Sequence, residues 1–149
     1  VGYFDIQPNS INIIPGTAAV TVDLRSADAN ILNTMKEQLD LGVERIAQDL
    51  GLTVSLEKLS DSSPVTFDEE CVATVRRAAN GLNYPHMDII SGAGHDAFWI
   101  NAVAPSAMIM CPCEDGLSHN EAEHITNEWA EAGANVLCRA ATDIAEIIN

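Results

Sequence analysis

Residues 88–103 read DIISGAGHDAFWINAV, in which a short apolar stretch runs into small residues and then into a helical pattern. The first three residues predict a buried strand, the next four a turn, and the remainder a helix. Small residues at such a turn let the backbone approach a ligand, and the amides at a helix start favour an anion or a carbonyl oxygen. Glycine turns are also common in α/β folds that bind nothing at that point. The stretch therefore predicts an α/β layer and makes Gly94 and His95 candidate site residues.

The sequence on either side of this stretch continues the α/β pattern. The apolar run Ser106–Cys111 predicts a second buried strand, because it does not alternate with polar residues. Strand, glycine loop, helix and strand in this order predict a parallel sheet, with ligand groups beyond the carboxyl ends of the strands. Helices are predicted over Asp68–Asn80, which Gly81 ends, and over Glu121–Ile148 with a break near residues 126–127.

The first part of the chain predicts an α+β layer. Val1–Ile6 and Ala18–Leu24 are strand-like, and Pro15-Gly16 between them is a strong turn signal, so a β-hairpin is expected. A helix is expected to start near residues 26–28 and to end at Gly51. Thr53–Leu59 alternates and predicts another strand. The divide between the two parts is expected near residues 60–68.

Charge and composition exclude several classes of protein. Seven Lys and Arg against 22 Asp and Glu give a formal net charge of −15, which repels phosphate backbones and anionic lipid. Nucleic acid and membrane surfaces are therefore not expected as partners, and no apolar run is long enough to span a bilayer. Hydrophobic content of 47% fits a soluble globular protein, and a cytoplasmic location is expected.

The four cysteines do not show the paired spacing of a structural zinc site. Because that spacing is absent and the cysteines have apolar neighbours in the sequence, we expect reduced thiols in or near the core. They are Cys71, Cys111, Cys113 and Cys138.

Two further spots carry candidate site residues. His119 lies in a polar stretch after a predicted buried strand, where it is either a metal ligand or a surface histidine. Asn12 and Arg25 are expected on the two arms of the hairpin, where an amide beside a guanidinium would grip a carboxylate. The alternative is an exposed arginine paired with Asp23 or Asp28.

Three strings of the chain together resemble the hydantoinase/carbamoylase amidases. They are PNSINIIPG followed by VDLR (residues 8–16 and 22–25), SGAGHDA (residues 91–97) and SHNEAE (residues 118–123). The family contains N-carbamoyl-L-amino-acid hydrolases and allantoate and ureidoglycolate amidohydrolases. It lies within the superfamily of dinuclear zinc aminoacylases and carboxypeptidases. The resemblance covers essentially the whole chain in the right order.

The resemblance implies a portion of an α/β catalytic domain joined to part of an α+β lid, or dimerisation, domain. Residues 1–61 would be the second half of the lid, and residues 62–149 the C-terminal part of the catalytic domain. Asn12, Arg25 and Gly94 would bind the carboxylate and the ureido or carbonyl groups of a small substrate, with His95 beside them. His119 would be a metal ligand, and the lids would pair two subunits into a homodimer.

The resemblance also implies a departure from the family. The intact enzymes use two divalent ions (Zn, or Mn, Co or Ni), and only one ligand of that set has a counterpart here. The expected reaction is hydrolysis of the carbamoyl C–N bond of N-carbamoyl-L-amino acids, with allantoate or ureidoglycolate as alternative substrates. No residue is assigned as catalytic, and the 149-residue chain alone is expected to be inactive. A non-catalytic carboxylate-binding or dimerisation module, and a truncated or excerpted longer protein, are the other interpretations.

Overall fold

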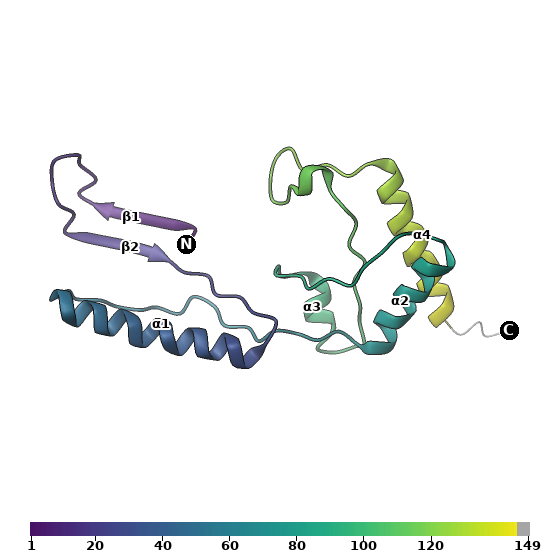
Figure 1. Ribbon diagram of the computed structural model, residues 1–149, viewed down its shortest axis with the longest axis horizontal. Coiled ribbons are helices and arrows are strands. Elements are labelled where there is room, and N and C mark those ends of the chain that lie inside the picture. The colour runs from purple at the N-terminus through teal and green to yellow at the C-terminus, as the bar shows by residue number, and fades with distance from the viewer. Residues whose placement is uncertain (146–149) are drawn as a thin grey trace. The chain divides into compact units, whose positions relative to one another are not determined.

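A computed structural model describes residues 1–145 of the chain, which contain both helices and strands (Figure 1). The chain divides into two compact units, Val1–Pro64 and Val65–Asn149.

The first unit opens with an antiparallel β-hairpin. β1 (Tyr3–Gln7) pairs with β2 (Thr17–Thr21) in a register that sets the first residue of each strand opposite the last residue of the other. The amide of Gly16 donates to the carbonyl of Gln7 at 2.8 Å and closes the loop between the strands. The hairpin prediction is confirmed. The expected extent of the second strand is wrong, because β2 ends at Thr21 and residues 22–25 have no strand partner among the described residues.

Helix α1 (Ala29–Leu50) follows, with both ends at the predicted positions. The side chain of Asp28 accepts from the amides of Asn30 and Ile31 at 2.7 and 3.2 Å, which satisfies two of the free donors of the first turn. At the other end Gly51 adopts the left-handed conformation with φ of 66°, which glycine adopts without steric cost. Leu32 and Ala47 are the buried residues of the helix.

The segment after α1 is extended but is not part of a sheet. Figure 1 shows it returning alongside α1, and an ion pair between Lys36 and Asp61 ties its end to the first half of the helix. The predicted strand at Thr53–Leu59 is wrong, since no strand is present there. The alternating pattern predicts an extended backbone, but a strand also requires a hydrogen-bonded neighbour, and none pairs with this segment within residues 1–145.

Asp61 predicts a pH dependence of the first unit's stability. Hydrogen bonds from Lys36 and then Lys58 lower the pKa of Asp61 below its ordinary value of 3.8. A carboxyl whose pKa falls on folding stabilises the folded state above the unfolded pKa, and this stabilisation is lost as the pH falls through the folded pKa. We expect Asp61→Asn to lower the urea midpoint slightly at neutral pH and to have no effect well below pH 3.8. Asp40→Asn is the control, because it alters an exposed aspartate on α1 that makes no ion pair within residues 1–145, and it should leave the urea midpoint at neutral pH nearly unchanged.

The described residues of the second unit, 65–145, contain three α-helices and one short 3₁₀ turn. They are α2 (Glu69–Gly81), α3 (Asp96–Ile100), η1 (Glu114–Gly116) and α4 (Asn127–Ile144). α2 begins where predicted, because the side chain of Asp68 accepts from the amide of Cys71 at 2.8 Å. α2 and α4 pack against each other (Figure 1).

Small side chains make the contact between α2 and α4. Ala78, Ala79, Val136 and Ala140 are the buried residues of this core, each at most 5% exposed. Val75, Leu82, Tyr84 and Ile109 pack around them. Alanines at the interface let the two helix backbones approach closely, so the core holds few large side chains.

The parallel sheet that the sequence predicts is absent from the described residues, whose one sheet is the two-stranded hairpin. Residues 88–90 and 106–111, the two predicted strands of this unit, are extended without a ladder partner within residues 1–145. Ile90 is 79% exposed, as expected for an apolar side chain without a neighbouring strand or helix to cover it. Single contacts to other parts of the unit hold these segments instead: Arg76 pairs with Asp88 at 2.7 Å, and the amide of Asp68 donates to the carbonyl of Ser106 at 3.1 Å.

Two helices are shorter than predicted. The helix expected to Val103 ends at Ile100, and turns lead to Pro105, which disfavours a helical residue before it. The helix expected from Glu121 begins at Asn127, with the Thr126 hydroxyl accepting from the amide of Trp129 at 3.3 Å. The last predicted residues of that helix, 146–148, lie outside the described residues.

All four cysteines are free thiols in the described structure. Three are half-buried as expected, but Cys138 is exposed, because it lies on the face of α4 that is turned away from the core. Burial raises the pKa of the Cys71 thiol, and the neighbouring carboxylate of Asp68 adds to the effect. None of the described helices combines the length and the apolar character needed to cross a bilayer.

Candidate functional site

Asn12 lies in the loop that joins the two strands of the hairpin. The prediction that it stands on a strand arm is wrong, since residues 8–16 form a loop between Gln7 and Thr17. Its side-chain oxygen accepts from the hydroxyl of Ser10 at 2.9 Å. The loop is therefore ordered by its own side chains, and Asn12 is exposed on it.

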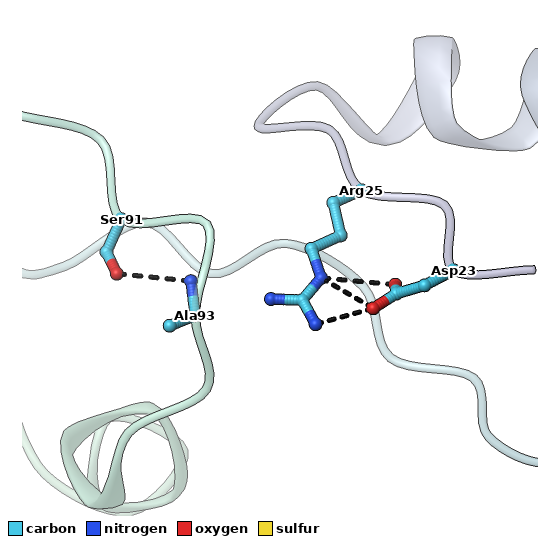
Figure 2. A network of polar contacts seen from close by, with 4 residues as sticks. All are labelled: Asp23, Arg25, Ser91 and Ala93. Atoms are coloured by element: carbon cyan, nitrogen blue, oxygen red, sulfur yellow. Dashed lines mark hydrogen bonds and ion pairs between the residues drawn. The ribbon is translucent and has the colours of Figure 1, made fainter. Parts of the chain in front are cut away.

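Arg25 follows the hairpin and engages the carboxylate of Asp23. Its Nε lies 3.1 and 3.0 Å from the two oxygens of Asp23, and its Nη2 lies 2.5 Å from one of them (Figure 2). The same pairing lowers the pKa of Asp23 and raises that of Arg25, mainly through the hydrogen bond. An ion pair between Arg25 and Asp23 is the alternative to a substrate role that the sequence predicts for Arg25. It also shows that the guanidinium is oriented to take a carboxylate on the edge formed by Nε and Nη2.

The bend between residues 90 and 96 is held by the hydroxyl of Ser91. The amide of Ala93 donates to Ser91 Oγ at 3.2 Å (Figure 2), and His95 Nε2 lies 2.9 Å from the same oxygen. A Cβ built on Gly94 meets no atom within 4 Å, and Gly94 is not in the left-handed region. Neither close packing nor a left-handed backbone requires a glycine at position 94. A glycine is also used where a ligand approaches the backbone closely, and this use remains open for Gly94.

His119 lies in the loop between η1 and α4 and is exposed. Its φ is 56°, an uncommon conformation for a residue with a side chain. The carboxylate of Glu123 accepts from the backbone amide of His119 at 2.9 Å, and the side chain of Asn120 accepts from the amide of Ala122 at 2.9 Å. The positive φ of His119 is not helical, and the predicted helix does not start here but at Asn127.

The described residues by themselves do not fit a divalent metal. His119 offers one imidazole, whereas a tightly held metal takes three or four protein ligands. Over residues 1–145, no group of three or more histidine, cysteine, aspartate or glutamate side chains is arranged to hold a metal ion. His119 therefore fits a metal at most as one ligand of a set.

The five predicted site residues fall into both units. Asn12 and Arg25 belong to Val1–Pro64, while Gly94, His95 and His119 belong to Val65–Asn149. Within the second unit Gly94 and His95 are neighbours on the bend, and each unit presents its residues on loops rather than on strands.

Sequence reasoning missed two supporting residues. Ser91 contacts the ring of His95, and Glu123 contacts the backbone of His119. In both pairs the partner is four residues away in the sequence. A polar residue four positions from each candidate histidine therefore predicts a hydrogen-bond partner for it.

The sequence matches the model of one protein family, and the match covers most of the chain. That family is Peptidase family M20/M25/M40, and the matched residues are 5–143.

Three similar proteins give the resemblance more detail. An N-carbamoyl-L-amino-acid amidohydrolase of Rhizobium meliloti is 50% identical over 99% of this chain and 36% of its own length. The allantoate amidohydrolase of Escherichia coli K12 is 35% identical over 82% of this chain and 30% of its own length. A crystal structure of a hydantoinase/carbamoylase family amidase from Burkholderia multivorans superimposes with a TM-score of 0.88 at 52% identity, over 93% of this chain and 34% of that one. The chain thus spans about a third of the length of the relatives it matches.

Proposed function

Because this chain belongs to Peptidase family M20/M25/M40, we propose that it forms the C-terminal part of an amidohydrolase that cleaves the carbamoyl C–N bond of N-carbamoyl-L-amino acids. The observation that carries the proposal is the 50% identity to an N-carbamoyl-L-amino-acid amidohydrolase over nearly the whole chain. The reaction is proposed for a protein of the relatives' length, of which this chain corresponds to about a third.

Arg25 and Asn12 are the residues proposed to bind the substrate's carboxylate. The bidentate contact of Arg25 with Asp23 supports this role, because a substrate carboxylate has the same geometry as an aspartate side chain. The amide of Asn12 would add a neutral hydrogen bond to the same group. These contacts fix where the substrate lies, and correct placement is itself a large part of catalysis.

Gly94 and His95 are proposed to lie against the ureido or carbonyl end of the substrate. The space over Gly94 leaves its backbone open to a planar group, and the ring of His95 offers a polar atom beside it. Both residues are held by the bend that Ser91 closes, so they present a preformed surface.

Amidohydrolases of the M20 family are generally metal-dependent. A divalent metal, when bound, supplies an activated water and polarises the carbonyl that is attacked. His119 would be one ligand of such a centre in the longer protein, with Zn, Mn, Co and Ni all compatible with an imidazole. The hydrogen bond from its backbone amide to Glu123 supports this role, because it fixes the loop that carries the ring.

We further propose that residues 1–61 are the second half of a lid, or dimerisation, domain of α+β type and that residues 62–149 belong to the catalytic domain. The hairpin and α1 support the first assignment, since they are the strand and helix elements of the first unit. In the longer protein the lid would pair two subunits, and the substrate would be a small molecule that carries a carboxylate and a ureido group.

A chimeric enzyme tests the proposal. In the Rhizobium meliloti amidohydrolase, the 148 matched residues are replaced by this chain. The chimera is expected to release the free amino acid from N-carbamoyl-L-alanine, and the same chimera with His119→Ala is expected to be inactive. His86→Ala is the matched control and should retain activity, since His86 is an exposed histidine outside the proposed site. A folded chimera that hydrolyses no ureido compound would refute the proposal.

The same chimera separates the alternative substrates. Allantoate and ureidoglycolate also carry a carboxylate and a ureido group, and a relative that acts on allantoate is 35% identical to this chain. Faster hydrolysis of either compound than of N-carbamoyl-L-alanine would move the assignment to that substrate. Binding of all three without hydrolysis would indicate a carboxylate-binding module that has no catalytic role.

The isolated 149-residue chain is expected not to hydrolyse N-carbamoyl-L-alanine, with or without added Zn²⁺ or Mn²⁺. The reason is that one imidazole cannot hold the metal that the reaction needs. The measurement is ammonia release by the purified chain over many hours. Turnover that exceeds the His119→Ala variant would show that the chain holds a complete centre.

A further inference from the structure

The bend before α3 contains a hydrogen-bonded chain that ends on a histidine ring. Ala93 N lies 3.2 Å from Ser91 Oγ, and Ser91 Oγ lies 2.9 Å from His95 Nε2. Ser91 and His95 are both half-buried, so water solvates their polar atoms only in part.

The direction of this chain follows from the donors and acceptors available. A serine hydroxyl has one proton to donate and two lone pairs that accept. The amide of Ala93 can only donate, so it uses one lone pair of Ser91. Within residues 1–145 the hydroxyl makes no hydrogen bond to a carbonyl or a carboxylate, so the acceptor that the described residues offer for its proton is Nε2 of His95.

This direction fixes the tautomer of the ring. A neutral imidazole carries one proton, and an Nε2 that accepts leaves that proton on Nδ1. The opposite direction, with Nε2 donating, would leave the half-buried hydroxyl proton without an acceptor in the described part of the chain, which is unfavourable. Nδ1 of His95 makes no hydrogen bond within that part, so its N–H is left for an external acceptor.

We propose that Ser91 is a positioning residue that orients the imidazole of His95 and fixes its tautomer, so that Nδ1–H is the donor presented to an oxygen of the ligand. A carboxylate or a ureido carbonyl oxygen is the matching acceptor. The ligand part of this inference rests on the proposed function, and the tautomer part does not.

Nuclear magnetic resonance of the ring nitrogens tests the tautomer in the chain without ligand. At about pH 8.5 an ordinary imidazole is neutral, and the ¹⁵N shifts distinguish Nδ1–H from Nε2–H. His95 is expected as the Nδ1–H form in the wild type and in Ser91→Thr, which keeps the hydroxyl. In Ser91→Ala the ring is expected to change toward the Nε2–H form. Only four histidines are present, so single substitutions assign the signals.

His86 is an internal reference in the same spectra. Its Nδ1 lies 3.0 Å from the carbonyl oxygen of Tyr84, which can only accept, so this ring is also protonated at Nδ1 but independently of Ser91. Its signals should not change in Ser91→Ala. Ser106→Ala is the matched substitution, because the hydroxyl of Ser106 donates to the carbonyl of Ala104 at 2.9 Å and should leave His95 unchanged. An Nε2–H ring at His95 in the wild type, or one that Ser91→Ala leaves unaltered, would overturn the proposal.

Titration of the chimera with N-carbamoyl-L-alanine, in the His119→Ala form that is expected to be inactive, tests the ligand part of the inference. The ¹⁵N signal of Nδ1 in His95 is expected to move on binding, and Ser91→Ala is expected to weaken binding by about threefold to tenfold, as for the loss of one oriented hydrogen bond. If the tautomer depends on Ser91 while the ligand moves no histidine signal, the proposed function fails and the positioning role stands. If the ligand binds equally well to Ser91→Ala, the positioning role in binding is wrong.

Discussion

Replacing Arg25 by alanine is expected to weaken binding of N-carbamoyl-L-alanine by about 10- to 150-fold, which corresponds to about 1.5–3 kcal/mol for hydrogen bonds to a charged group. The contact with Asp23 shows the physical reason, since Nε and Nη2 together already hold a carboxylate. A ligand carboxylate would take the place of Asp23 on the same planar donor edge. Calorimetry on the chimera with His119→Ala, which is expected to be inactive, measures the affinity directly.

The controls for Arg25 separate geometry from charge. Arg25→Lys keeps the charge but lacks the fork, so it should recover only part of the affinity. Arg45→Ala removes an exposed arginine of α1 that lies outside the proposed site and should leave binding unchanged. Equal losses in Arg25→Ala and Arg45→Ala would mean that general charge attracts the ligand and that Arg25 has no specific role.

Gly133→Ala is expected to destabilise the second unit by about 1–3 kcal/mol, which is the usual range for overpacking a core. A Cβ at Gly133 would lie 2.4 Å from the sulfur of Cys111, far inside the contact distance. Alanine in a helix interior is ordinarily better than glycine by about 1 kcal/mol, so a net loss would run against helix propensity. Urea denaturation followed by fluorescence reports on this unit, because both tryptophans, Trp99 and Trp129, lie in it.

Two further variants test whether the overlap with the sulfur of Cys111 causes the loss of stability. Gly42→Ala in α1 is the matched control: a Cβ there meets nothing within 4 Å, so this change should stabilise its unit. Cys111→Ala removes the sulfur and should rescue most of the loss in the double variant with Gly133→Ala. A double variant as unstable as the two single losses added together would mean that the sulfur is not what excludes a side chain at this position.

The helices were the more predictable part of the fold because their signals are local. Asp28 and Gly51 bound α1, and Asp68 begins α2, each through a contact within four residues of the helix end. Sheet pairing depends on residues distant in sequence, so the alternation at Thr53–Leu59 correctly implied an extended backbone and wrongly implied a strand. The apolar run Ser106–Cys111 was misread in the same way.

The sequence predicts which residues are candidates for the site better than it predicts where the structure places them. Arg25 was given two interpretations from the sequence, and the structure shows the pairing with Asp23 without testing the other. Nothing in the sequence indicated that β2 would stop at Thr21, which places Arg25 after the strand. The sequence predicts that the stretch around His119 opens a helix, but His119 has a positive φ and the helix begins at Asn127. A residue with a side chain rarely adopts that conformation, so the sequence does not indicate it.

The extended segments without a strand partner also affect how this polypeptide behaves at high concentration. Their amides and carbonyls form no ladder within residues 1–145, so another copy could add a strand to them, and the apolar side chains along them favour this. At neutral pH the charge of −15 keeps copies apart, and this repulsion weakens in concentrated salt. Near the isoelectric point of about 4.3 the repulsion disappears while the extended segments remain. Colloidal stability of the chain is therefore set by its acidic surface, and mildly alkaline buffers of low ionic strength are the conditions that preserve it.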